Sequence, residues 1–153
     1  MFSIDAIMST NLFTVTPDAT LADARALMQE NRIHHLPVTA DEKLVGLVTI
    51  TNVLAASDSF LRDEDRIHAA EIIVNDVMVT DVATVDVNAS LRQAALFLEK
   101  HQIGCLPVMD NSKLVGIITE TDFVAVAINL LEQIESTEPV DDYFDDVEDE
   151  DIA

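Results

Sequence analysis

The chain has 153 residues, 49% of them hydrophobic, which is enough to bury one sizeable core. Its 29 acidic and 8 basic residues give a formal net charge of −21, which excludes nucleic acid and anionic membranes as main partners because both are bound through clustered basic residues. With one cysteine, no zinc-type cysteine spacing and no apolar leader or long apolar run, the chain is predicted to be soluble, cytoplasmic and free of structural metal.

The chain contains an internal sequence repeat. Residues 4 to 56 recur as residues 74 to 126, at a constant offset of 70 residues and without a gap. Two copies this small cannot each close a core, so we expect them to pack on each other. A ligand would then sit in the groove between them.

The first repeat opens with an apolar leader at residues 4 to 8 and a short strand at 14 to 16. Thr20 and Asp23 have the spacing of a helix capping box, and apolar residues follow at helical spacing until Asn31. We therefore expect a capped amphipathic helix here.

The rest of the repeat is predicted to be a hairpin followed by a helix. An apolar segment at 33 to 38 contains Pro37, which cannot donate to a strand ladder and suits an edge or strand entry. A polar turn separates it from a β-rich strand at 44 to 49. A second helix begins around Thr51. Each repeat is thus strand, helix, strand, strand, helix, and the fold class is α+β.

The second repeat has the same order, and the preceding residues 70 to 77 are predicted to form a short helix. We expect four segments along the chain. They are a first repeat with its leader (1–56), a charged linker (57–73), a second repeat (74–131) and an acidic, disordered tail (132–153). The tail either keeps the protein soluble or binds a basic partner through anchors such as Tyr143 and Phe144.

One motif stands at the strand-to-helix transition of both repeats. It has the form Gly-x-x-Thr-x-x-Asp/Asn: Gly46, Thr49 and Asn52 in the first copy and Gly116, Thr119 and Asp122 in the second. The Thr and the residue three positions later could simply cap the helix. Alternatively, the helix start attracts a phosphate, the Thr hydroxyl donates to it, and the carboxylate of Asp122 accepts from both hydroxyls of a ribose.

The repeated pattern M-x-T, T-V, A-x-L-x-x-A, I-x-x-L-P-V and K-L-V-G-x-x-T-x-T-D resembles a tandem pair of cystathionine-β-synthase (CBS) domains, a Bateman module, over roughly residues 1 to 131. The resemblance implies two β-α-β-β-α units related by a pseudo-twofold axis. It also implies clefts for AMP, ADP, ATP or S-adenosylmethionine. Since basic residues are scarce, AMP or ADP is the expected ligand, and no cofactor is required.

The family's binding residues map onto two unequal sites. The main site combines the motif of the second copy with two segments of the first copy: Asp122, Thr119, Thr121, His34, His35, Phe13, Thr14 and Val15. The second site is weaker because an amide replaces the carboxylate: Thr49, Asn52, Thr84 and Gly104.

Other readings of the candidate residues remain open. His34 and His35 face opposite ways if they lie on a strand, so at most one enters the cleft, and both could be partly exposed residues without a ligand. Cys105 is either a redox thiol or, as its strand position favours, a structural residue.

The sequence therefore favours a non-catalytic sensor that binds an adenosine-containing ligand and modulates an unknown separate protein. The resemblance also implies a homodimer, for which helix faces around Val53, Leu54, Phe123 and Val126 are suited. The alternative is a ligand-independent dimeric scaffold that uses its acidic tail. An enzyme is disfavoured because no nucleophile-base pair, phosphate-binding loop or dinucleotide fingerprint occurs.

Overall fold

The computed structural model describes residues 3–58 and 72–137. Its contacts divide the chain into two compact units, Met1–Glu120 and Thr121–Ala153. The first unit contains the whole first repeat and the second repeat up to the end of its last strand, and the second unit contains nearly all of the final helix. No helix within the described residues is long and apolar enough to cross a membrane.

The elements follow the predicted order in both copies. The first half contains α1 (Ile4–Ile7), α2 (Leu21–Asn31), β1 (His35–Ala40), β2 (Lys43–Thr49) and α3 (Ile50–Asp58). The second half contains the short 3-10 helix η1 (Val74–Asp76), β3 (Val85–Asp86), α5 (Leu91–His101), β4 (Cys105–Asp110), β5 (Lys113–Thr119) and α6 (Glu120–Thr137). The mixed helix and strand class expected from the sequence is confirmed.

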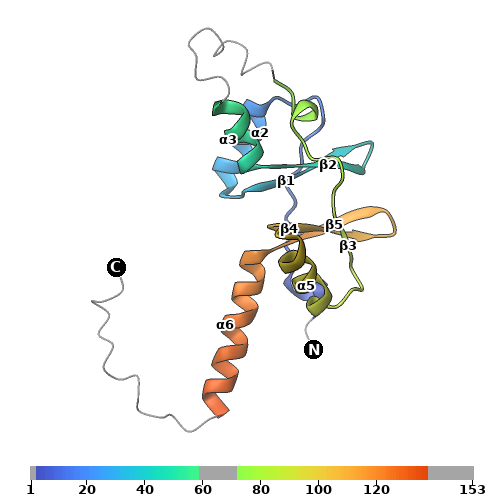
Figure 1. The fold of residues 1–153 in the computed structure, drawn as a ribbon. Helices are drawn as coiled ribbons and strands as arrows, with labels where there is room; N and C mark the ends of the chain where they lie inside the picture. Colours follow the sequence, from blue (N-terminus) through green and yellow to red (C-terminus); the bar gives the residue numbers. More distant parts are fainter. Residues whose placement is uncertain (1–2, 59–71, 138–153) are drawn as a thin grey trace, which may run out of the picture. The chain divides into compact units, whose positions relative to one another are not determined.

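Each half contains a small sheet built on an antiparallel hairpin. β1 pairs with β2, and β4 pairs with β5, in the same register, and in both hairpins the register shifts two residue pairs before the turn. The strand expected at 84 to 86 is β3, parallel to β4. The strand expected at 14 to 16 is reduced to one parallel bridge, Val15 to Val38. In Figure 1, α2 and α3 cover the outer side of the first hairpin and α5 covers that of the second.

Local sequence explains the ends of these elements. The Thr20 hydroxyl accepts from the Asp23 amide at 3.1 Å, and the Asp23 carboxylate accepts from the Thr20 amide at 3.4 Å, so the predicted capping box starts α2. Ser90 and Gln93 repeat it at α5. The turn residues Asp41 and Glu42 both have positive φ, the conformation that matches the twist of a tight hairpin.

Pro37 lies inside β1, opposite Leu47, and is not at the strand entry. Its carbonyl accepts from the Val15 amide at 3.1 Å, while the amide of Thr39 donates to the Val15 carbonyl. The missing Pro37 donor points to the same side of the strand as the Thr39 amide, because alternate residues of a strand share a side. That side carries only the single bridge, so β1 tolerates the proline.

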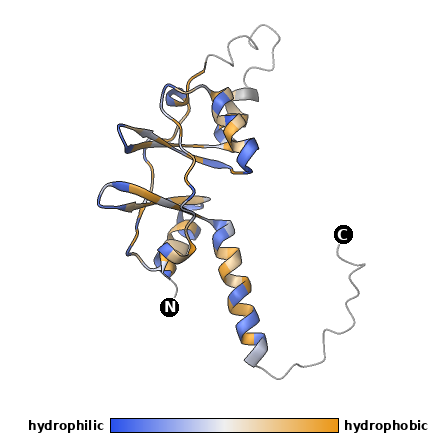
Figure 2. Ribbon diagram, turned by 180° about the vertical axis from the view of Figure 1, so that it is seen from behind, coloured by the Kyte–Doolittle hydropathy of each residue, from blue (hydrophilic) through white to orange (hydrophobic). Residues whose placement is uncertain are grey.

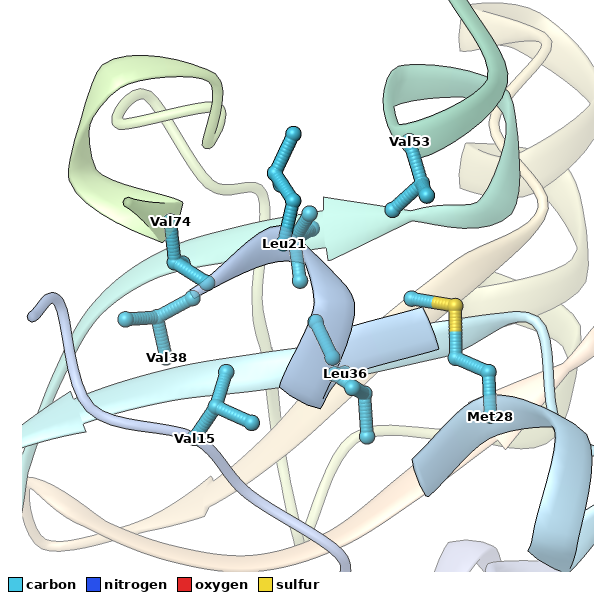
Figure 3. Close-up of a cluster of buried hydrophobic side chains, with 9 residues drawn as sticks. Val15, Leu21, Met28, Leu36, Val38, Val53 and Val74 are labelled. Carbon is cyan, nitrogen blue, oxygen red and sulfur yellow. The ribbon is translucent and has the colours of Figure 1, made fainter. Parts of the chain in front are cut away.

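The core of the first half joins residues from every element around the hairpin. Figure 3 shows apolar side chains of α2, β1 and α3 converging on one cluster, which also contains Val74 from the segment before the second repeat. Val74 is 0% exposed. Burial of a valine side chain stabilises the folded state by about 1.5–3 kcal/mol, so Val74 stabilises this core as much as a buried valine of the first repeat does.

The segments that precede the two repeats are exchanged between the halves. Ser3 bridges to Ser90 and Ser9 to Ile117, so the leader of the first repeat runs along the second half. Ile73 bridges to Thr20 and Val79 to Leu47, so the equivalent segment of the second repeat runs along the first half. The bridge between Ser3 and Ser90 has its equivalent in the bridge between Ile73 and Thr20 when the two repeats are exchanged. The two halves are therefore related by an approximate twofold axis. Both exchanged segments can be traced in Figure 1.

Two glycines receive the exchanged segments. A Cβ built on Gly46 would lie 2.5 Å from the sulfur of Met78, and a Cβ on Gly116 would collide with the sulfur of Met8. Both glycines are buried in the middle of a strand. Glycine is therefore needed here for close approach, because each exchanged methionine occupies the space that any side chain would take.

The leader of the first repeat packs on the other half, and the last helix extends beyond the predicted start of the tail. The sequence groups residues 4 to 8 with the first repeat, yet this leader packs against the second half because Ile4 and Met8 find their partners there. The sequence places residues 132 to 137 in the disordered tail, yet α6 continues to Thr137. Residues 138–153 and most of the linker, residues 59–71, lie outside the described part of the chain.

We expect Gly46→Ala to lower the free energy of unfolding by about 1–3 kcal/mol, since the new methyl group must displace the sulfur of Met78. Thermal and urea unfolding of the purified variant would measure this loss. The double variant Gly46→Ala with Met78→Ala should be less destabilised than the sum of the two single changes, because removal of the methionine makes room. Additive losses would show that Met78 does not occupy the glycine site.

Candidate functional site

In the first copy the Gly-x-x-Thr-x-x-Asn motif is a helix cap. Thr49 ends β2, and Asn52 lies in the first turn of α3. The Thr49 amide and hydroxyl both donate to the Asn52 side-chain oxygen, at 3.0 and 2.8 Å, and the Asn52 amide donates to the Thr49 hydroxyl at 3.2 Å. Both acceptor atoms are thus used by the helix start.

This geometry limits what the first copy can bind. The Asn52 side-chain oxygen already accepts two hydrogen bonds, and the remaining amide nitrogen of Asn52 can only donate. The hydroxyls of a ribose are donors that need an acceptor. At Asn52 the first copy therefore offers no carboxylate and no uncommitted amide oxygen to a ribose.

In the second copy the motif ends the last strand and opens the last helix. Thr119 is the final residue of β5, half-buried, and pairs across the hairpin with Cys105. The exposed Thr121 and the half-buried Asp122 belong to the first turn of α6. Asp122 differs from Asn52 in carrying a full negative charge and two acceptor oxygens with four lone-pair sites.

The two histidines occupy different environments. His34 is exposed, and its carbonyl accepts from the amide of Ile50 at 2.9 Å. His35 begins β1 and is half-buried. Its Nε2 would lie 3.0 Å from a Cβ built on Gly104, so the imidazole extends from the first half onto the backbone of the second. Of the two histidines, His35 is therefore the one directed toward the opposite copy.

The sequence assigns His35 and Gly104 to opposite clefts, whereas the structure brings them into contact. The Gly104 carbonyl accepts from the amide of Glu120 at 3.2 Å, and Glu120 directly follows Thr119. His35 thus lies beside the strand end that carries Thr119. The sequence did not identify Glu120 as a neighbour of His35. The one sign of it in the sequence is that Glu120 lies inside the motif, where the first copy has Ile50.

Charge and burial act on His35 in opposite directions. Burial lowers the pKa of His35, and repulsion by His34 lowers it further, whereas the negative charge of Glu120 raises it. The net effect is a lowered pKa, and the imidazole is neutral near pH 7.

The expected adenine-flanking segment is divided between core and surface. Val15 is 8% exposed and packs in the core of the first half, and its amide and carbonyl are both used by β1. Phe13 packs against the same core, whereas Thr14 is exposed, as is its counterpart Thr84. Among these residues Thr14 and Thr84 have the side chains most accessible to a ligand.

Cys105 is 3% exposed, and burial raises the pKa of its thiol to about 12. Since the thiolate is the reactive form, this position supports the structural reading of the residue. No group of three or more histidine, cysteine, aspartate or glutamate side chains within residues 3–58 and 72–137 could hold a metal ion. Val53, named from the sequence as part of a dimer face, is 1% exposed and belongs to the core.

Residues 4–59 and 74–129 each match the CBS domain. The chain belongs to the CBS domain family. The two matches cover both repeats, so the predicted tandem CBS pair is confirmed.

Relatives of known name support the same assignment. The CBS domain-containing protein YhcV of Bacillus subtilis is 30% identical over 122 residues, which are 80% of this chain and 83% of YhcV. The inosine-5'-monophosphate dehydrogenase of Thermoplasma acidophilum is 36% identical over 121 residues, but these form only 22% of that enzyme. The similarity to the enzyme is thus confined to a small part of it.

Solved structures share the fold over nearly their whole length. A Vibrio cholerae protein assigned to acetoin utilization (AcuB) is 41% identical, with a TM-score of 0.76, and the match covers 91% of this chain and 99% of that protein. CBSX2, crystallised in complex with AMP, is 29% identical, with a TM-score of 0.73, and the match covers 86% and 99% of the two chains. At least one similar CBS pair, CBSX2, therefore binds an adenosine ligand.

We expect Asn52→Ala to lower the free energy of unfolding by about 1 kcal/mol, because the Thr49 amide and hydroxyl lose their acceptor at the start of α3. Urea unfolding monitored by circular dichroism would measure it. Asn52→Asp keeps an acceptor at the same position and should retain the stability of the wild type or exceed it. Equal losses in both variants would contradict the capping role.

Proposed function

We propose that this chain is a non-catalytic regulatory module that binds AMP or ADP between its two CBS repeats and modulates a separate protein in the cytoplasm. The observation that carries the proposal is the difference between the two motifs. The first copy has the neutral amide of Asn52 three residues after Thr49, whereas the second copy has a carboxylate, Asp122, three residues after Thr119. One main nucleotide site per chain follows.

The residues around Thr119 suit an adenosine phosphate. Asp122 supplies acceptors for the ribose hydroxyls, and Thr119 with the start of α6 supplies donors for a phosphate. His35, beside the same strand end, supplies a further donor. Thr14 and Phe13 are proposed to flank the adenine, and Thr121 and His34 complete the set. The binding of AMP by the similar CBSX2 supports this ligand class.

ATP and S-adenosylmethionine are less suited to these residues. Only 8 basic residues stand against 29 acidic ones, so the larger negative charge of ATP finds few partners without a bound cation. S-adenosylmethionine has no phosphate for the Thr119 hydroxyl and the helix start. No cofactor is required in this proposal, because the nucleotide acts as the signal.

Asp122→Ala is expected to weaken AMP binding by about 10- to 100-fold, because the ribose hydroxyls lose charged acceptors. Isothermal titration calorimetry with AMP, ADP, ATP and S-adenosylmethionine would measure affinity and stoichiometry. The wild type should bind one AMP per chain. Asn52→Ala is the matched control in the other repeat and should leave the AMP affinity unchanged.

If none of the four ligands gives a binding heat, the sensor proposal fails. If AMP binds and Asp122→Ala has no effect, the ligand assignment stands and the site assignment fails. A second, weaker binding event that disappears in Asn52→Ala would assign it to the site of Thr49, Asn52, Thr84 and Gly104.

We further propose that the protein is a homodimer. α6 has no buried residue, and five of its large apolar side chains are 42–58% exposed: Val124, Ile128, Leu130, Leu131 and Ile134. Figure 2 shows apolar and polar residues along this helix. So much exposed apolar surface on one helix is unfavourable in water and suits a subunit contact.

Ile128→Glu should shift the protein from dimer toward monomer, because a buried charge in a subunit contact is strongly unfavourable. Sedimentation equilibrium would distinguish a mass near twice 16.8 kDa from the mass of a single chain. Asn129→Asp adds a charge at the neighbouring exposed position and serves as the control. A monomeric wild type, or an unchanged dimer in Ile128→Glu, would rule out this contact.

The alternative function is a dimeric scaffold that recruits a basic partner through residues 138–153, which contain no basic residue. Deletion after Thr137 leaves α6 whole and separates the two functions. A sensor keeps AMP binding after this deletion, whereas a scaffold loses its partner and never binds AMP. The similarity to AcuB gives acetoin utilization as the process in which to seek the regulated partner.

A further inference from the structure

His35 carries an imidazole that the structure places at the contact between the strand starts of the two repeats. Its Nε2 lies against Gly104, where any larger residue would force the imidazole to move. The equivalent position in the second copy is Cys105, which is buried and whose thiol cannot take up a proton as an imidazole can. Although the fold has two equivalent positions, His35 therefore has no imidazole as its counterpart in the second copy.

The charged neighbours of His35 are divided between the two copies. His34 precedes it on the same strand start, and Glu120 follows the last strand of the other repeat. Gly104, between them, carries no charge. Burial and His34 favour the neutral imidazole, and Glu120 alone favours the charged form. Burial and His34 together outweigh Glu120, so the pKa of His35 is lowered.

A phosphate group that enters beside Thr119 changes this balance. It adds one or two negative charges close to the imidazole, in a partly buried position where charges are weakly screened. The imidazolium that burial disfavours is then compensated by a second anion besides Glu120. The phosphate thus raises the pKa of His35, and binding and protonation assist each other.

We propose that His35 is the residue that couples nucleotide binding to the uptake of a proton and selects adenosine ligands that carry a phosphate. This inference rests on the proposed function and deepens it. The empty protein holds His35 neutral, and the AMP complex holds it protonated. An adenosine ligand without a phosphate leaves the proton balance unchanged, and a cationic ligand such as S-adenosylmethionine opposes protonation.

The sign of the pH dependence follows from this linkage. AMP affinity rises as the pH falls through the interval between the lower pKa of the empty protein and the higher pKa of the complex, by at most about tenfold per pH unit. Adenosine affinity does not change. Measurements stay at pH 6.5 and above, because the phosphate itself gains a proton near pH 6.

The test is calorimetry of AMP and adenosine binding to the full chain at pH 7.0 in two buffers with different ionisation enthalpies. For AMP the observed heat should differ between the buffers by the amount expected for uptake of a fraction of one proton, and the Kd should rise about tenfold from pH 6.5 to pH 8.0. For adenosine both quantities should be constant. His35→Gln keeps a hydrogen-bond donor and should remove the buffer and pH dependence of AMP binding.

His101→Gln is the control, since it removes an exposed imidazole at the end of α5, outside the proposed site, and it should keep the proton uptake. Proton uptake that persists in His35→Gln overturns the inference, as does AMP binding without proton uptake by the wild type. Both results leave the proposed function intact. Absence of binding by AMP and adenosine alike overturns the inference and the proposed function together.

Discussion

The exchange of leaders between the two halves is the contact on which the rest of the structure depends. Ile4 and Val74 are both fully buried, and the segment of each repeat runs along the other half. Neither half is complete without residues that the chain supplies from elsewhere. The exchange also explains the two buried glycines, because a bare strand backbone is what lets Met8 and Met78 approach. A pair of small, otherwise marginal units thus becomes one cooperative structure.

The symmetry of the backbone is not matched by the side chains at the strand ends. Equivalent positions hold Asn52 and Asp122, His35 and Cys105, and Ile50 and Glu120. Two of these differences place acidic residues, Glu120 and Asp122, directly after Thr119, where the first copy has Ile50 and Asn52 directly after Thr49. The hairpin register that leads to both strand-to-helix transitions is thus retained, while the side chains that follow the two strands differ in charge.

Much of the fold could be predicted because its signals are local. Thr20 with Asp23 indicates a helix start, the polar turn between two β-rich runs indicates a hairpin, and the constant offset doubles each observation. The exchange of the leaders could not be predicted from the sequence. The apolar residues of a leader indicate that it is buried, but they do not indicate which repeat it packs against. The contact of His35 with Gly104 and Glu120 was missed for the same reason: it depends on how two distant strand starts meet, and no spacing along the chain encodes that distance.

The exchanged leaders also indicate how such a chain can arise. If a single repeat existed as a separate polypeptide, two copies could bury each other's leaders in a reciprocal swapped dimer, as the two halves do within this chain. Duplication and fusion then turn an encounter between two molecules into closure within one chain, at an effective concentration of about millimolar for a short linker. Fusion also frees the two copies to diverge, because one gene no longer has to encode both faces of the site.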